Sequence, residues 1–344
     1  EILYVSVFLK RAIMKLTHLT FLLIEKPIRT KRPLSKIKTA TISFAFFTPV
    51  IILAGVWGIY INQVQEDNLD NINEIIHPGA LALKYDTIEQ PNVDNLTFIP
   101  RILDVKSDLP ESYNDGCHQD VAKSDLIECS YGNTKNPKYT IALVGGSHSA
   151  HWLPALNIIA EEENIKLLNY TKSGCRFTTE LNYSQNNASL NSCEKWNGEL
   201  MEVIINKKPD LVFTTANATE QEGIPKGYID KWNTLNKESI NVFAIRDNPR
   251  FQVDVPTCIE INGEFSTECV LDRNSVLPSD IWNDIIVPQN VYYTDLSDYF
   301  CEEEVCKPIV GNVLVYRDHH HITATYSKTL APILSEEIMK VLSK

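Results

Sequence analysis

The first 116 residues contain no cysteine, whereas eight cysteines follow, and no two of those have the C-x-x-C spacing of many metal sites. An even number of cysteines confined to one part of a chain is typical of disulfides formed in an oxidising compartment. The sequence alone leaves their connectivity open. Pairing of sequence neighbours closes the shortest loops, so we expect the bonds Cys117–Cys129, Cys175–Cys193, Cys258–Cys269 and Cys301–Cys306.

Charge is missing from a long stretch near the N-terminus. No charged residue occurs between Thr39 and Ile61, and that length suffices to cross the hydrocarbon core of a bilayer. Pro49 is compatible with such a span, and a buried helix of a soluble core is the alternative. Basic residues precede the stretch and acidic residues follow it, so the positive-inside rule places the N-terminus in the cytoplasm and the body outside. We predict a transmembrane helix over residues 37–62.

Basic residues are scarce in the rest of the chain. Residues 1–62 contain nine Lys and Arg against two Glu, whereas the remainder contains 23 basic and 42 acidic residues. Binding of nucleic acid needs a concentrated basic surface, so this acidic body excludes nucleic acid as the main partner. Residues 63–137 are rich in Asn, Asp, Pro and Gly and are predicted to form a linker and a loop-rich segment. Residues 138–344 are predicted to form the folded domain.

Strand and helix patterns alternate along that domain. Apolar, β-branched runs predict strands at residues 139–145, 165–171, 209–216, 240–247 and 290–296. Helical patterns occupy residues 149–164 and 323–342. The alternation predicts an α/β fold in which helices cover both faces of a parallel sheet. Sites in such sheets form at the carboxyl ends of the strands, so the residues that follow each strand are the candidates for chemistry.

A serine follows the first of these strands, within the segment GGSHS. A tight turn between a strand and a helix can expose a hydroxyl, and backbone N–H groups at the helix N-terminus can stabilise an oxyanion. Ser147 is therefore a candidate nucleophile. A serine that caps the helix is the alternative interpretation.

Asp318 and His321 form a candidate acid–base pair in the segment RDHHH, before the last predicted helix. Their spacing lets the carboxylate orient the imidazole, which would take the proton of Ser147 as a general base. A zinc site built from these side chains is the alternative, but adjacent residues rarely point at one ion, and no distant partner is evident. We expect no metal, and we expect His319 and His320 to face solvent or to pack within the loop.

The segments VGGSHSAHW and DHHHIT resemble the SGNH domain that is fused to membrane acyltransferase-3 (AT3) family proteins, the O-acetyltransferases of bacterial surface glycans. The family blocks G-D-S-H and D-x-x-H-[LI]-[ST] match Gly145–His148 and Asp318–Thr323, and KSGC, CEKW and RDNP between them are also similar to family features. The resemblance covers residues 138–344 and implies a three-layer α/β/α flavodoxin-like SGNH-hydrolase fold. The segment FLLIEKPIR is similar to the end of the family's membrane domain, so residues 1–36 are interpreted as a remnant of that domain and a cytoplasmic basic loop.

The resemblance also implies an oxyanion hole. Its donors would be the backbone N–H groups of Ser147 and Gly174 and the side chain of Asn217, with ordinary turn residues as the alternative for Gly174 and Asn217. One position departs from the family pattern, because Gly146 stands where the family has an aspartate.

The function that the resemblance implies is transfer of an acyl group, in the first place acetyl, to hydroxyls of an extracytoplasmic glycan through Ser147. The domain would bind no cofactor, since acetyl-CoA would donate through the membrane domain. Its partners would be that domain, the lipid bilayer and a surface polysaccharide such as lipopolysaccharide. The domain would lie in the periplasm or outside the cell, anchored to the inner or plasma membrane. An esterase of the same glycan esters and an inactive glycan-binding domain, suggested by Gly146, are the alternatives.

Overall fold

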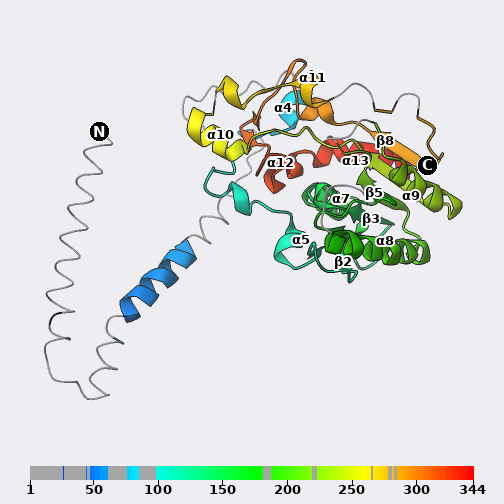
Figure 1. Cartoon of the computed structure of the whole chain (residues 1–344), viewed down its shortest axis with the longest axis horizontal. Coiled ribbons are helices and arrows are strands. Elements are labelled where there is room, and N and C mark those ends of the chain that lie inside the picture. Colours follow the sequence, from blue (N-terminus) through cyan, green and yellow to red (C-terminus); the bar gives the residue numbers. More distant parts are fainter. Residues whose placement is uncertain are drawn as a thin grey trace. The chain divides into compact units, whose positions relative to one another are not determined.

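The structure is a computed structural model that describes residues 26, 44, 47–60, 76–84, 98–180, 187–218, 223–264, 266–277, 281–282 and 285–344. The chain divides into two compact units, Glu1–Asp67 and Asn68–Lys344. Residues 47–60 of the first unit are helical (Figure 1). Nearly all of their side chains are exposed.

The predicted transmembrane helix over residues 37–62 lies partly outside the described residues. Its described part carries exposed apolar side chains such as Ile51, Leu53 and Trp57. Among the residues that the structure describes, no helix combines the length and the apolar character that crossing a bilayer requires. The span therefore stays a prediction, as do the boundaries at residues 36, 62 and 137.

A mostly parallel, seven-stranded sheet forms the centre of the second unit, in the order β1-β4-β3-β5-β6-β8, with β2 also paired to β4. Five strands match the prediction and pair in parallel. They are β3 (Tyr139–Gly145), β4 (Ile165–Lys172), β5 (Leu211–Thr215), β6 (Asn241–Ile245) and β8 (Val291–Thr294). The short strands β1 (His118–Gln119) and β2 (Cys129–Gly132) lie in the segment predicted as linker and loops, and β2 runs antiparallel to β4.

Helices cover both faces of this sheet, which confirms the three-layer α/β/α prediction. Alternate residues of a strand point to opposite faces, so Ile141 of β3 packs with α7 (Leu153–Glu162), α12 (Ala324–Thr329) and α13 (Ala331–Leu342). Its neighbour Ala142 packs on the other face with α8 (Asn187–Lys207) and α9 (Lys226–Lys237). In Figure 1, β3 and β5 lie between α13 and α8.

The two helices that the sequence predicts at residues 149–164 and 323–342 are each split in two. The first consists of α6 (Ser147–Ala150) and α7, and the second of α12 and α13. Pro154 and Pro332 lie in the first turns of α7 and α13. Proline favours a helix start because it lacks the N–H that a helix interior would need.

The other elements are short: α4 (Leu81–Lys84), η2 (Val105–Ser107), α5 (Glu111–Asn114), α10 (Val255–Asn262), η3 (Thr267–Cys269), α11 (Arg273–Val276), η4 (Ser297–Tyr299), and the pairs β7 (Leu271–Asp272) with β9 (Val305–Cys306) and β10 (Ile309–Val310) with β11 (Val313–Leu314).

All eight cysteines are paired, and the predicted connectivity between sequence neighbours is confirmed. The bonds are Cys117–Cys129, Cys175–Cys193, Cys258–Cys269 and Cys301–Cys306.

Candidate active site

The carboxyl ends of β3, β4, β5 and β6 meet at one edge of the sheet, because these strands are parallel. Ser147 begins α6, and one residue, Gly146, separates it from the end of β3. Gly145, the last residue of β3, has φ +128°, and a Cβ at that position would clash with Oγ of Ser149. Only glycine adopts this backbone without strain, so it allows the tight turn that brings Ser147 to the edge.

The structure brings Ser147, His321 and Asp318 together in one chain of hydrogen bonds, although 174 residues separate the serine from the histidine. Oγ of Ser147 lies 2.7 Å from Nε2 of His321, and Nδ1 of His321 lies 2.7 Å from Oδ2 of Asp318. Since an ionised carboxylate only accepts hydrogen bonds, the imidazole proton lies on Nδ1, and Nε2 faces the hydroxyl as an acceptor. This is the arrangement that a serine nucleophile and its general base require.

A short loop holds Asp318 in place. Its Oδ1 accepts the backbone N–H groups of His320, at 2.8 Å, and His321, at 2.7 Å. A β-bridge between Tyr316 and Ile322 closes the base of the loop. The carboxylate therefore has little freedom to turn away from the imidazole.

The protonation states fit the same arrangement. Burial works to raise the pKa of Asp318, but its hydrogen bonds from His321 and the loop amides outweigh burial and hold that pKa well below its usual range. Burial lowers the pKa of His321 to about 4, against an opposing effect of Asp318. At neutral pH the carboxylate is thus charged and the imidazole neutral, as a general base must be.

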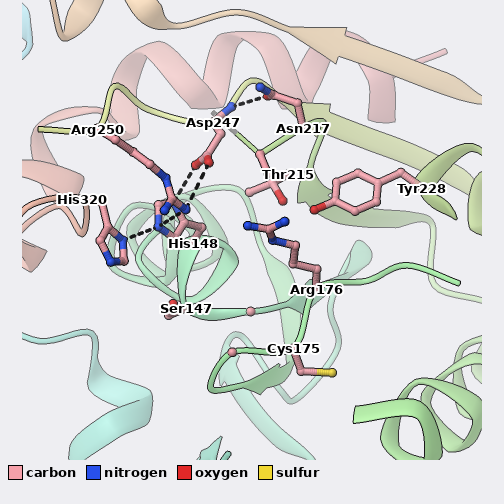
Figure 2. Close-up of a pocket in the computed structure, with 13 residues that line it drawn as sticks. Ser147, His148, Cys175, Arg176, Thr215, Asn217, Tyr228, Asp247, Arg250 and His320 are labelled. Carbon is pink, nitrogen blue, oxygen red and sulfur yellow. Dashed lines mark hydrogen bonds and ion pairs between the residues drawn. The ribbon is translucent and has the colours of Figure 1, made fainter. Parts of the chain in front are cut away.

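Gly174 and Asn217, the other predicted oxyanion donors, line the same cavity as Ser147. The volume of this cavity is about 160 Å³, and Figure 2 shows Ser147 and Asn217 around it. Gly174 has φ +59° in the turn after β4. Oδ1 of the buried Asn217 accepts the backbone N–H of Asp247 at 2.9 Å, which orients the amide and leaves Nδ2 as its donor. The structure brings the predicted donors to one cavity, and their role stays a prediction.

A second chain of polar side chains runs beside the first and was not predicted. Nδ1 of His148 lies 2.6 Å from Oδ1 of Asp247, and its Nε2 lies 2.6 Å from Nδ1 of His320 (Figure 2). Arg250 donates to the same Nε2 at 3.1 Å. Because arginine can only donate, this Nε2 is an acceptor and the proton of His148 lies on Nδ1, toward Asp247.

This second chain connects Asp247, which follows β6, to His148, the residue after Ser147. Burial alone would raise the pKa of Asp247, but His148 and Arg250 outweigh it and hold that pKa well below its usual range. Nδ2 of Asn248 also donates to the backbone oxygen of His320 at 2.9 Å. The segment after β6 therefore supports both α6 and the loop of Asp318.

The prediction that His320 packs within the loop is confirmed, since its ring contacts those of His319 and His321, but further contacts were missed. His320 lines the cavity and contacts His148, whereas His319 is exposed. The segment RDNP at the end of a predicted strand marks Asp247 as a candidate residue. Nothing in that segment indicates that Asp247 and His320 both contact His148. Such contacts depend on the packing of loops from distant parts of the chain.

Two groups of side chains could offer ligands to a metal ion within the described residues. His148, His320 and His321 form one group, and Asp318, His319 and His320 form the other. In the first group, His148 is a partner distant in sequence. The expectation that no distant partner exists, which was used against a metal, is therefore wrong. However, the 2.6 Å between His148 and His320 is a hydrogen-bond distance, shorter than the roughly 3.3 Å between two nitrogens on one tetrahedral zinc. The expectation of no metal stays a prediction.

The periplasmic domain of a lipopolysaccharide acetyltransferase from Salmonella ser. Paratyphi A is similar at 17% identity and a TM-score of 0.48, over 60% of this chain and 85% of that one. No curated protein matches the chain. The family described as "SGNH domain (fused to AT3 domains)" matches residues 116–336, which include β1 and β2 as well as the whole cavity edge of the sheet. Because this match spans more than half of the chain, the protein belongs to the family of SGNH domains that are fused to AT3 domains.

Proposed function

We propose that this domain transfers an acyl group to a hydroxyl of an extracytoplasmic glycan through an ester on Ser147. Acetyl is the first candidate for that group. The observation that carries the proposal is the chain of hydrogen bonds from Ser147 through His321 to Asp318. Membership of a family fused to AT3 domains supports acyl transfer as the reaction and a membrane acyltransferase as the partner. The same membership supports a membrane-anchored protein with this domain in the periplasm or outside the cell.

The reaction divides into two displacements that share one base. Nε2 of His321 takes the proton of Ser147 while Oγ attacks the carbonyl carbon of the acyl donor, and the imidazolium returns that proton to the leaving group. An acceptor hydroxyl then gives its proton to His321, attacks the acyl carbon and releases Ser147, whose Oγ regains the proton. Each attack creates an oxyanion, which the backbone N–H groups of Ser147 and Gly174 and Nδ2 of Asn217 would stabilise. Loss of one such donor typically lowers the rate about 10²- to 10³-fold.

The glycine at position 146 does not disturb this geometry. Its backbone is unstrained, with φ −84°, and a Cβ there would meet only the backbone of Cys175 at ordinary distance. Ser147 still reaches His321 at 2.7 Å. This favours an active domain over an inactive glycan-binding one.

Substitution of the nucleophile tests the proposal in cells that carry the full-length protein with its AT3 domain. We expect Ser147→Ala to lower glycan O-acetylation to the level of cells without the protein, measured by NMR of the purified glycan. Ser130→Ala is the matched control, because Ser130 is an exposed serine on β2, and it should keep wild-type acetylation. Unchanged acetylation in Ser147→Ala cells would refute the proposal, and higher acetylation would favour an esterase.

A further inference from the structure

Two arginines face the cavity that contains Ser147. Arg176 and Arg250 line it, and Figure 2 shows the guanidinium group of Arg176 inside the pocket, near Thr215 and Tyr228. Arg250 approaches from the opposite side, where it contacts His148 at 3.1 Å and Asp247 at 3.9 Å. Neither arginine takes part in the proton transfers proposed above.

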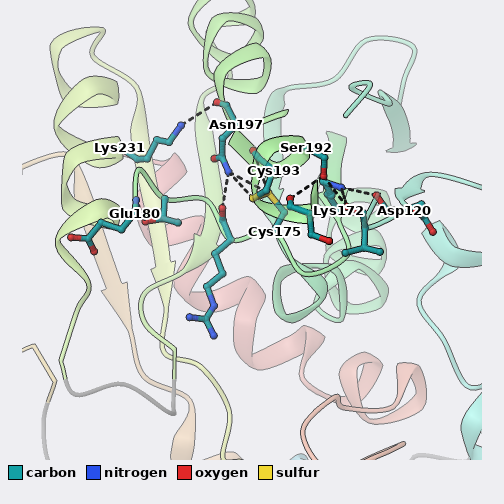
Figure 3. The surroundings of a disulfide bond; sticks show 12 residues. Asp120, Lys172, Cys175, Glu180, Ser192, Cys193, Asn197 and Lys231 are labelled. Atoms are coloured by element: carbon teal, nitrogen blue, oxygen red, sulfur yellow. Dashed lines mark hydrogen bonds between the residues drawn. A yellow bond between two sulfur atoms is a disulfide. The ribbon is translucent and has the colours of Figure 1, made fainter. Parts of the chain in front are cut away.

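The backbone of Arg176 is held firmly. The residue before it forms the disulfide Cys175–Cys193, which joins the turn after β4 to α8 (Figure 3). Nδ2 of Asn197 donates to the backbone oxygen of Arg176 at 2.9 Å, and the N–H of Thr178 donates to the same oxygen at 3.0 Å. A rigid backbone lowers the entropic cost of presenting a side chain to a ligand.

The charge of the cavity is opposite to that of the chain. The whole sequence has a formal net charge of −12, whereas the cavity lining, as far as the structure describes it, contains two arginines and one carboxylate, that of Asp247. Asp247 is 3% exposed, and its single negative charge offsets only one of the two arginines, so the described lining keeps a net positive charge. A cationic cavity in an acidic protein concentrates anions at that point of the surface.

We propose that the acceptor is an acidic sugar, whose carboxylate or phosphate group binds Arg176 while its hydroxyl faces Ser147. The proposal rests on the proposed function for the hydroxyl and adds the class of acceptor. The planar guanidinium group pairs with carboxylate or phosphate through two parallel hydrogen bonds. Such a contact orients the sugar, which increases the rate at which one chosen hydroxyl attacks.

Another role for Arg176 makes a different prediction. If the guanidinium stabilised the oxyanion, its loss would slow the reaction of every acceptor equally, since all acceptors pass through the same transition state. If it binds the acceptor's anionic group, its loss slows charged acceptors selectively. The ratio between charged and neutral acceptors therefore separates the two roles.

The experiment uses the purified full chain, p-nitrophenyl acetate as donor and three matched acceptors. These are methyl glucoside, methyl glucuronide and methyl glucoside 6-phosphate, which differ only in the group at C6. We expect kcat/KM for at least one charged acceptor to exceed that for the neutral one by roughly tenfold or more, and Arg176→Gln to remove most of that preference. Arg101→Gln is the control, because Arg101 pairs with Asp104 at an exposed site, and it should keep the preference. The better charged acceptor identifies carboxylate or phosphate as the natural group.

A binding measurement keeps the test independent of turnover. Saturation-transfer NMR on Ser147→Ala should detect the charged sugar more strongly than methyl glucoside, and the added Arg176→Gln should abolish the difference. Equal signals for charged and neutral sugars, or an equal loss for all three acceptors in Arg176→Gln, would overturn the proposal. Absence of acetyl transfer together with selective binding of the charged sugar would instead contradict the proposed function and leave the acidic ligand standing.

Discussion

At the scale of single residues, the proposed chemistry depends on the protonation of His321. The imidazole accepts the proton of Ser147 only when it is neutral. Burial lowers its pKa to about 4, compared with about 6.5 for an unperturbed histidine. The neighbouring imidazole of His320 is held neutral in the same way, since burial lowers its pKa to about 2.

The pH dependence of the rate follows from this shift. We expect kcat/KM for p-nitrophenyl acetate to stay level from neutral pH down to about pH 5 and to fall as pH drops through the pKa of His321, about 4. Activity is lost on the acid side because protonation of His321 removes the general base. The measurement is a rate profile at constant ionic strength, and assays at neutral pH after acid exposure control for unfolding. An acid limb near the ordinary histidine pKa of about 6.5 would contradict the assignment.

The sequence predicts the residues of the first hydrogen-bonded chain but not those of the second. Ser147 follows a clear strand, and the spacing of Asp318 and His321 is itself a signal, because a loop of that length allows the two side chains to meet. The contact of His148 with Asp247 and His320 joins three segments of the chain. No local pattern reports such a contact, since it depends on how the loops after β3 and β6 pack on the last loop.

At the scale of elements, the disulfide Cys175–Cys193 fixes the turn that carries Gly174 and Arg176 to helix α8. It closes a loop with a sequence separation of 18. A disulfide stabilises a protein in large part by restricting the unfolded chain, and the effect grows with loop length. This bond therefore contributes to stability as well as to the shape of the cavity.

Removal of that bond should be measurable in the free energy of unfolding. We expect Cys175→Ser with Cys193→Ser to lower it by about 3 kcal/mol, measured by urea denaturation followed by fluorescence. The control is the pair Cys301→Ser with Cys306→Ser, which opens a loop with a separation of only 5 and should cost about 1 kcal/mol less. An equal or smaller loss in the first variant would contradict the dependence of the stabilisation on loop length.

The elements themselves were largely predictable. The five predicted strands carry apolar runs because both faces of a parallel sheet are buried, and the structure places all five where the sequence predicts them. The strands β1 and β2 were missed because β1 has only two residues and β2, with the sequence CSYG, carries no continuous apolar run. The breaks between α6 and α7 and between α12 and α13 depend on local turns that hydrophobic periodicity does not report.

At the scale of the whole molecule, the second unit combines an acidic sequence, four disulfides and a cationic cavity at one edge of its sheet. Disulfides are typical of proteins that work in an oxidising compartment, which agrees with a place in the periplasm or outside the cell. In the proposed function, the acyl donor would come from the AT3 domain to which domains of this family are fused. An acyl group held as an ester on Ser147 would let the same cavity bind first the donor and then the glycan acceptor.

In the proposed reaction, Ser147 carries the acyl group between donor and acceptor. The most direct test is to mix the full chain with p-nitrophenyl acetate, quench it with acid within the first turnover, and map acetylated peptides by mass spectrometry. We predict one acetyl group on Ser147, absent from Ser147→Ala and removed when an acceptor sugar is added before the quench. Continued transfer of acetyl groups by a protein whose Ser147 never becomes acetylated would contradict the account.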